Sequence, residues 1–191
     1  RARKPLQQRR QLPAVVYYLQ PQKQQAVRRT ASLILVVGCG SMLSVCVMGL
    51  WHLGCVTAAC LAERHRVVGY DEDAKVVADL QAGKPPIFEP GLSEAIQSAS
   101  AKGSLSFSSD LAAAAKDADV LYITYDTPVN ENDEPDLTPI ESTVERLLPI
   151  LSDEQLIVIS SQVPVDTCRS IFEKIQGAGK KVNLCYCPEN L

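Results

Sequence analysis

From residue 42 to the end of the chain, short apolar runs alternate with longer amphipathic stretches. The apolar runs are rich in Val, Ile and Leu, which is typical of the buried strands of a parallel sheet. The stretches between them carry apolar residues at helical spacing. We therefore predict strands at 45–48, 66–70, 105–107, 120–124, 156–160 and 182–185, and helices at 52–63, 73–82, 92–101, 112–116, 138–151 and 165–176.

Strands that alternate with helices predict βαβ units. We expect an α/β fold of the Rossmann type, a doubly wound and mostly parallel sheet, formed by residues 42–191 as a single domain. Asp73 is a good N-cap for the helix that follows the second strand. Three Pro residues within 84–91 fix the backbone and predict a rigid loop.

The first 41 residues differ from the rest of the chain. Eight of the 19 basic residues and none of the 22 acidic residues lie within residues 1–30, which show no apolar period. Basic residues ahead of an apolar stretch resemble a signal peptide or a membrane anchor. We favour the alternative, in which residues 1–41 are an irregular, dispensable extension and no membrane is involved, because glycines interrupt the apolar stretch and Met42 resembles a domain start.

Charge and cysteine content exclude some classes of function. The net charge is −3 although the first 30 residues are basic, so the remainder is acidic and unsuited to nucleic acid. The seven cysteines include no CxxC pair and the chain has two His, so we expect no metal site. Cys46, Cys55 and Cys60 lie in apolar runs, where we expect buried thiols. An odd number of unpaired cysteines is typical of a reduced protein, which we expect in the cytoplasm.

A glycine pattern marks the start of the first predicted helix. Gly49 and Gly54 follow a strand and open a helix, as two of the three glycines of the dinucleotide-binding GxGxxG fingerprint do. These glycines allow the tight turn and the close helix packing, and the helix N-terminus then faces the phosphates. Trp51 replaces the middle glycine, so its side chain either points outward or changes the contact with the phosphate. Asp71 ends the second strand, where an acid binds the adenosine ribose and repels the extra phosphate of NADP, so we predict NAD as the cofactor.

Five motifs follow one another along the chain. They are VMGLWHLG (47–54), VVGYDED (67–73), GKPPIFEPGL (83–92), ADVLYITYDTP (118–128) with PDL (135–137), and SSQVPVDT (160–167) with CPENL (187–191). Together they resemble the N-terminal, NAD-binding domain of the UDP-glucose/GDP-mannose dehydrogenase family. The proline loop and the TP and PE motifs are far more specific than the glycine pattern, and the resemblance covers about residues 44–191.

The resemblance implies roles for the residues of the glycine turn. It implies that Gly49 and Gly54 lie under the pyrophosphate of NAD. Three of the positions between them, at the turn and the helix start, are expected to face the cofactor, namely Trp51, His52 and Leu53.

The resemblance also implies roles for residues at the ends of the other strands. Asp71 holds the adenosine ribose, and Thr127 and Ser161 face the nicotinamide side of the cofactor. Glu189 matches a family glutamate that assists acid–base chemistry near the sugar. Gln162 stands where the family commonly has a Thr near the catalytic water, and its amide is able to hydrogen-bond a water.

Similar enzymes oxidise the primary alcohol of a nucleotide sugar to a carboxylate with two NAD, and a Cys thiol captures the aldehyde. The resemblance thus implies a nucleotide-sugar substrate, a place in polysaccharide biosynthesis, and a homo-oligomeric full enzyme. The family's sugar-binding domain and its nucleophilic Cys lie beyond Leu191, so we expect this chain to bind NAD but to be inactive alone. One alternative is a stand-alone NAD-binding Rossmann module without catalysis. A second is a dehydrogenase of the β-hydroxyacid type, against which the PPIFEPGL loop and the PEN end argue.

Overall fold

The computed structural model describes residues 42–187, in which strands and helices alternate as the hydrophobic pattern predicts. The strands are β1 (Ser44–Met48), β2 (Arg66–Tyr70), β3 (Leu105–Ser108), β4 (Val120–Ile123), β5 (Leu156–Ile159) and β6 (Asn183–Tyr186). The helices are α2 (His52–Leu61), α3 (Ala74–Gln81), α4 (Leu92–Ala101), α5 (Leu111–Ala115), α6 (Thr138–Leu147) and α7 (Thr167–Gly177).

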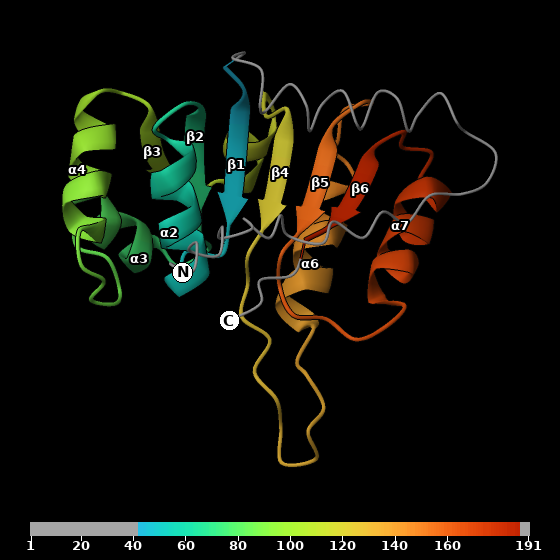
Figure 1. Cartoon of the computed structure of the whole chain (residues 1–191). Coiled ribbons are helices and arrows are strands. Elements are labelled where there is room, and N and C mark those ends of the chain that lie inside the picture. Colours follow the sequence, from blue (N-terminus) through green and yellow to red (C-terminus); the bar gives the residue numbers. More distant parts are fainter. Residues whose placement is uncertain (1–41, 188–191) are drawn as a thin grey trace, which may run out of the picture.

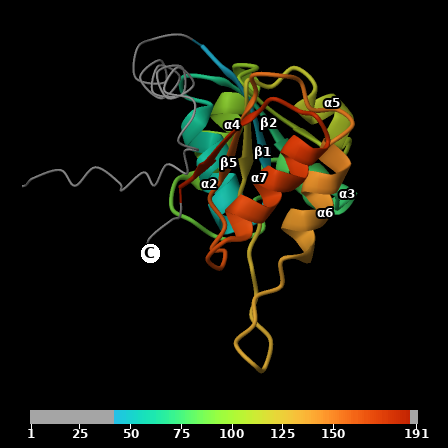
Figure 2. The same cartoon turned by 90° about the vertical axis from the view of Figure 1, so that its right-hand side faces the viewer.

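The strands form one parallel sheet with the order β3-β2-β1-β4-β5-β6. Their carboxyl ends all lie at the lower edge of the sheet in Figure 1, where the loop after β4 extends furthest from it. Helices α2 and α4 cover one face, while α5, α6 and α7 cover the other, which Figure 2 shows along the sheet. The predicted doubly wound, Rossmann-type α/β fold is therefore confirmed.

The central strand β1 divides the hydrophobic core into two halves. Val45 and Val47 contact the cluster formed with α2, α3 and α4, whereas Cys46 and Met48 contact the cluster formed with α5, α6 and α7. The side chains alternate because successive residues of a strand point to opposite faces of the sheet. All four are buried, which explains why this strand is a continuous apolar run.

Three helix boundaries differ from the prediction by two residues or more. Helix α6 ends at Leu147 rather than at residue 151, because Pro149 has no N–H to continue the hydrogen-bond ladder. Helix α7 begins at Thr167 rather than at residue 165, because Asp166 has a φ of 70° and cannot belong to a right-handed helix. Helix α2 ends at Leu61 rather than at residue 63, in a tighter turn of i to i−3 hydrogen bonds.

The predicted extension, residues 1–41, and residues 188–191 lie outside the described part of the chain. Within residues 42–187, no helix has both the length and the apolar character that crossing a bilayer requires. The six cysteines of this part are free thiols. Within the same described residues, His, Cys, Asp and Glu side chains form no group of three or more that could hold a metal ion.

Candidate functional site

The sheet reverses its winding at β1, which lies between β2 and β4. In open α/β sheets, ligands bind beyond the carboxyl ends of the strands at this switch point. The loops that begin there follow β1, β2, β4 and β5, and they contain most of the residues that the sequence singles out. The fold therefore places residues as far apart in sequence as Gly49 and Ser161 at the same edge of the sheet.

Glycine is required twice in the turn after β1. Gly49 has a φ of 92°, a left-handed value that disfavours any side chain, and its N–H donates to the carbonyl of Tyr70 at 3.0 Å. A Cβ atom placed on Gly54 would lie 1.9 Å from the carbonyl oxygen of Gly49. The two glycines therefore let the first turn of α2 pack directly on the end of β1.

Trp51 adopts the outward orientation, the first of the two predicted alternatives. It has a φ of −88°, which suits a residue with a side chain, and it is 50% exposed. Trp51 is also the N-cap of α2, and no side chain caps this end of the helix. The first N–H groups of α2, on His52, Leu53 and Gly54, thus have no intrahelical partner and are available to an anion.

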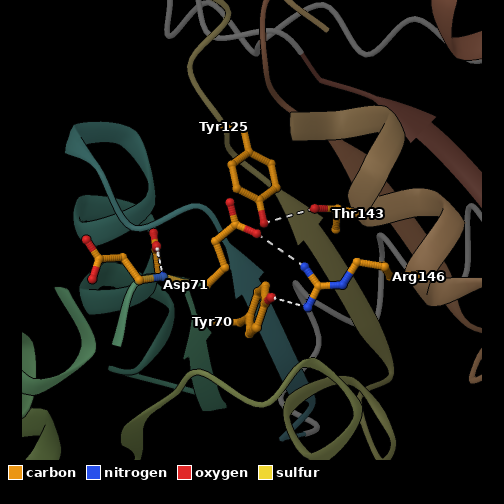
Figure 3. A network of polar contacts seen from close by, with 7 residues as sticks. Tyr70, Asp71, Tyr125, Thr143 and Arg146 are labelled. Atoms are coloured by element: carbon orange, nitrogen blue, oxygen red, sulfur yellow. Dashed lines mark hydrogen bonds and ion pairs between the residues drawn. The ribbon is translucent and has the colours of Figure 1, made fainter. Parts of the chain in front are cut away.

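Asp71 is held against the glycine turn by its own carboxylate. Its Oδ2 accepts from the N–H of Leu50 at 2.9 Å, and its Oδ1 accepts from the N–H of Asp73 at 3.0 Å. Asp71 follows the end of β2 in the close-up of Figure 3. Each carboxylate oxygen has a second lone pair, so this carboxylate retains the capacity to accept two hydroxyl groups.

The loops after β4 and β5 are joined at the other side of the switch point. The hydroxyl of Thr127 donates to the carbonyl of Gln162 at 2.6 Å. Ser161 is buried, and within the described residues its Oγ is the one buried side-chain polar atom without a hydrogen-bond partner. A buried hydroxyl without a partner destabilises the fold until a ligand or a water forms a hydrogen bond with it. The side chain of Gln162 is exposed.

These features fit a dinucleotide. The glycine pair leaves room for a phosphate at the uncapped start of α2, Asp71 offers acceptors for a ribose, and Ser161 offers an unused hydroxyl. Glu189, the predicted acid–base residue, lies outside the described residues, so its position is untested.

Comparison with known proteins gives a family. The model of the UDP-glucose/GDP-mannose dehydrogenase family, NAD binding domain, matches residues 43–191. The chain belongs to this family. Family membership agrees with the resemblance that the five motifs indicate. The chain is also similar in sequence and in fold to several dehydrogenases of nucleotide sugars.

Two curated relatives are 35% identical to the chain. The UDP-N-acetyl-D-mannosamine dehydrogenase of Methanococcus maripaludis aligns over 77% of this chain and 34% of its own length. The UDP-glucose 6-dehydrogenase of Pseudomonas aeruginosa aligns over 70% of this chain and 30% of its own length. This chain thus spans about a third of the length of these relatives.

Solved structures show the same fold. A UDP-glucose dehydrogenase from the archaeon Pyrobaculum islandicum superposes with a TM-score of 0.73 at 33% identity, over 80% of this chain and 37% of that one. The 3-hydroxyisobutyrate dehydrogenase of Mycobacterium tuberculosis superposes with a TM-score of 0.52 at 17% identity, over 79% of this chain and 42% of that one. The second similarity shows a shared fold alone.

Two residues that contact the turn after β1 were not predicted from the sequence. Thr124 is fully buried, and its hydroxyl lies 2.9 Å from the carbonyl oxygens of both Met48 and Gly49, to which it donates. Tyr125 contacts Gly49 with its ring. The motif in 118–128 contains both residues, but only the pairing of β4 with β1 brings them to the turn.

The proline loop also contacts the start of α2, which the sequence did not indicate. His52 Nε2 lies 3.0 Å from Glu89 Oε1, and both side chains are partly exposed. The loop thus lies beside the helix start that would face the cofactor.

The thiols of Cys46 and Cys55 are unsuited to nucleophilic attack at neutral pH. Burial raises the pKa of Cys46 and of Cys55 to about 12, and for Cys55 the nearby charge of Asp71 adds to the effect. The prediction that Cys60 is buried was wrong, because the core face of α2 carries residues 55, 58 and 59, and Cys60 lies on the opposite side of the helix.

Proposed function

We propose that this chain is the NAD-binding part of a nucleotide-sugar dehydrogenase of the UDP-glucose 6-dehydrogenase type, an oxidoreductase that converts a primary alcohol of the sugar to a carboxylate with two NAD. One observation carries the proposal: the Gly49–Gly54 turn is hydrogen-bonded to the carboxylate of Asp71 at the switch point of the sheet. This arrangement supplies a phosphate site and a ribose site at adjacent positions.

Each part of the site has a task in this function. The bound NAD accepts the hydride of the alcohol. The free N–H groups of α2 bind the pyrophosphate, and Asp71 accepts hydrogen bonds from the hydroxyls of the adenosine ribose. The negative charge of Asp71 disfavours a phosphate on that ribose, so NAD is preferred over NADP. The hydroxyl of Ser161 donates to the nicotinamide half, which satisfies a group that otherwise has no partner.

The substrate side of the reaction rests on the relatives. Those reported above are named for UDP-N-acetyl-D-mannosamine and UDP-glucose, and two of them are equally identical to this chain. The substrate is accordingly a nucleotide sugar. We expect the isolated chain to bind NAD without turning over a sugar, because it spans only about a third of the length of these relatives.

A chimera tests this function. Residues 42–191 replace the matching part of the Pseudomonas aeruginosa UDP-glucose 6-dehydrogenase, and NADH formation is followed with UDP-glucose. We expect the chimera to turn over UDP-glucose with NAD, and the isolated chain to show no turnover. The matched control, the chimera with Asp71→Ala, should show a raised KM for NAD. A folded chimera that binds NAD and leaves UDP-glucose unoxidised would contradict the dehydrogenase function and favour a stand-alone NAD-binding module.

A further inference from the structure

The ring of Tyr125 forms the floor beneath the glycine turn. A Cβ atom placed on Gly49 would lie 2.7 Å from Tyr125 Cδ1 and 3.0 Å from its Cγ and from its backbone N, and no other residue comes as close to that position. Tyr125 directly follows Thr124, whose hydroxyl holds the carbonyl oxygens of the same turn. The backbone of the turn is thus hydrogen-bonded by one residue of this loop and supported by the ring of the next.

Helix α6 holds this ring in place. The hydroxyl of Thr143 donates to the phenol oxygen of Tyr125 at 3.0 Å, and burial raises the pKa of this phenol, so it stays protonated. One turn further along α6, Arg146 donates to the phenol oxygen of Tyr70 at 2.8 Å. Figure 3 shows Thr143 and Arg146 reaching from α6 toward these two phenols. The helix therefore contacts the end of β2 and the loop after β4, on the two sides of β1.

We propose that Tyr125 is a positioning residue for the pyrophosphate of NAD, acting through Gly49; the proposal rests on the NAD-binding function proposed above. A flat ring fits beneath Gly49 because that residue has no side chain. Gly49 also has a left-handed φ of 92°, one of many conformations open to a free glycine. The ring excludes the alternatives by steric contact, so the turn is already shaped for the phosphates before they bind.

A smaller side chain at residue 125 leaves a void under the turn. The turn then populates several conformations, and the affinity falls in proportion to the fraction that is competent to bind. The loss is confined to ligands that carry the phosphates, because Asp71 is still held by the N–H of Asp73, which lies outside the turn. A loss of affinity that is limited to phosphate-bearing ligands distinguishes a positioning role of Tyr125 from a general loss of stability.

The experiment compares ADP with adenosine. Trp51 is the one tryptophan of the chain and lies on the turn, so its fluorescence reports ADP binding there. Adenosine, which lacks the phosphates, is titrated by NMR chemical shift in the same protein. We expect Tyr125→Leu to raise the Kd of ADP about tenfold, as when only a tenth of the molecules hold the competent turn, and to change the Kd of adenosine less than about twofold.

Two further variants separate the ring from its hydroxyl. Tyr125→Phe keeps the ring under Gly49 and should restore the ADP affinity to within about twofold of the unmodified chain. Tyr70→Phe removes the phenol that Arg146 contacts and leaves the floor of the turn intact, so it should also bind ADP normally. If Tyr125→Leu does not fold, Tyr125→Met tests the same void with an unbranched side chain.

Equal losses of ADP and adenosine affinity in Tyr125→Leu, or in Tyr125→Met, would overturn the positioning role, as would unchanged affinity for both. A failure of the proposed NAD-binding function would give a different result, because the unmodified chain would then bind neither ADP nor NAD.

Discussion

Replacing Gly54 with Ala tests how closely the first turn of α2 packs on the end of β1. The added Cβ atom would lie 1.9 Å from the carbonyl oxygen of Gly49, 2.9 Å from its carbonyl carbon and 2.9 Å from Thr124 Oγ1. Two of these three atoms belong to backbone, which a rotamer change cannot move. The start of α2 must therefore shift away from the turn, and α2 is packed against the core through Cys55, Ala58 and Ala59.

Forcing a methyl group into a packed site typically costs about 1–3 kcal/mol, and the backbone overlap places Gly54→Ala at the upper end of that range. In a chain of this size each kcal/mol lowers the Tm by roughly 2–4 °C, so we expect the Tm to fall by about 6–12 °C. The displaced turn should also lose its affinity for NAD.

Thermal unfolding followed by circular dichroism measures this effect against a matched control. Gly177, the last residue of α7, has no atom within 4 Å of the position that a Cβ would take. Gly177→Ala should stabilise the chain by about 0.4–1 kcal/mol, because Ala loses less conformational entropy on folding. A Gly54→Ala variant that melts within about 2 °C of the unmodified chain would refute the packing argument.

Three further predictions concern single side chains. Thr124→Val should lower the free energy of unfolding in urea by about 1–3 kcal/mol, because it leaves the buried carbonyl of Gly49 without a donor; an unchanged midpoint would show that the hydroxyl is not needed. Ser161→Ala should change the same free energy by less than about 0.5 kcal/mol, because the hydroxyl has no partner to lose, and should weaken NAD binding; a large loss of stability would reveal a partner. The folded-state pKa of Cys46 is raised to about 12, so the unfolded chain releases this proton first and stability falls as pH rises from about 9 toward 12. Cys46→Ala should make that alkaline decline shallower, and an equal slope in both proteins would contradict the assignment.

The hydrophobic pattern is sufficient for the sheet and its helices because strand and helix periods are local properties of the chain. Every predicted strand and helix is present, and the errors concern ends that special residues determine. Pro149 stops α6 early, and the left-handed Asp166 delays the start of α7. The exposure of Cys60 was also within reach of the sequence, since the helical period places it opposite Cys55 and Ala58.

The sequence predicts the site residues whose spacing forms a motif. It does not predict the residues that reach the site only through contacts between strands. The order strand, glycine pair, helix, strand and acid identifies Gly49, Gly54 and Asp71. The contacts of Thr124 and Tyr125 with the turn depend on β4 lying beside β1, about 75 residues away, which no local pattern indicates. The unpaired hydroxyl of Ser161 likewise becomes visible only when all of its neighbours are placed.

Titration of the unmodified chain with NAD and with NADP tests the central claim most directly. Fluorescence of Trp51, on the turn that we propose binds the pyrophosphate, reports both ligands at the same place. We predict that NAD binds with a Kd lower than that of NADP by about tenfold or more, a difference of at least ~1.4 kcal/mol, and that Asp71→Ala narrows this ratio. Equal or tighter binding of NADP, or no response of Trp51 to either ligand, would contradict the account.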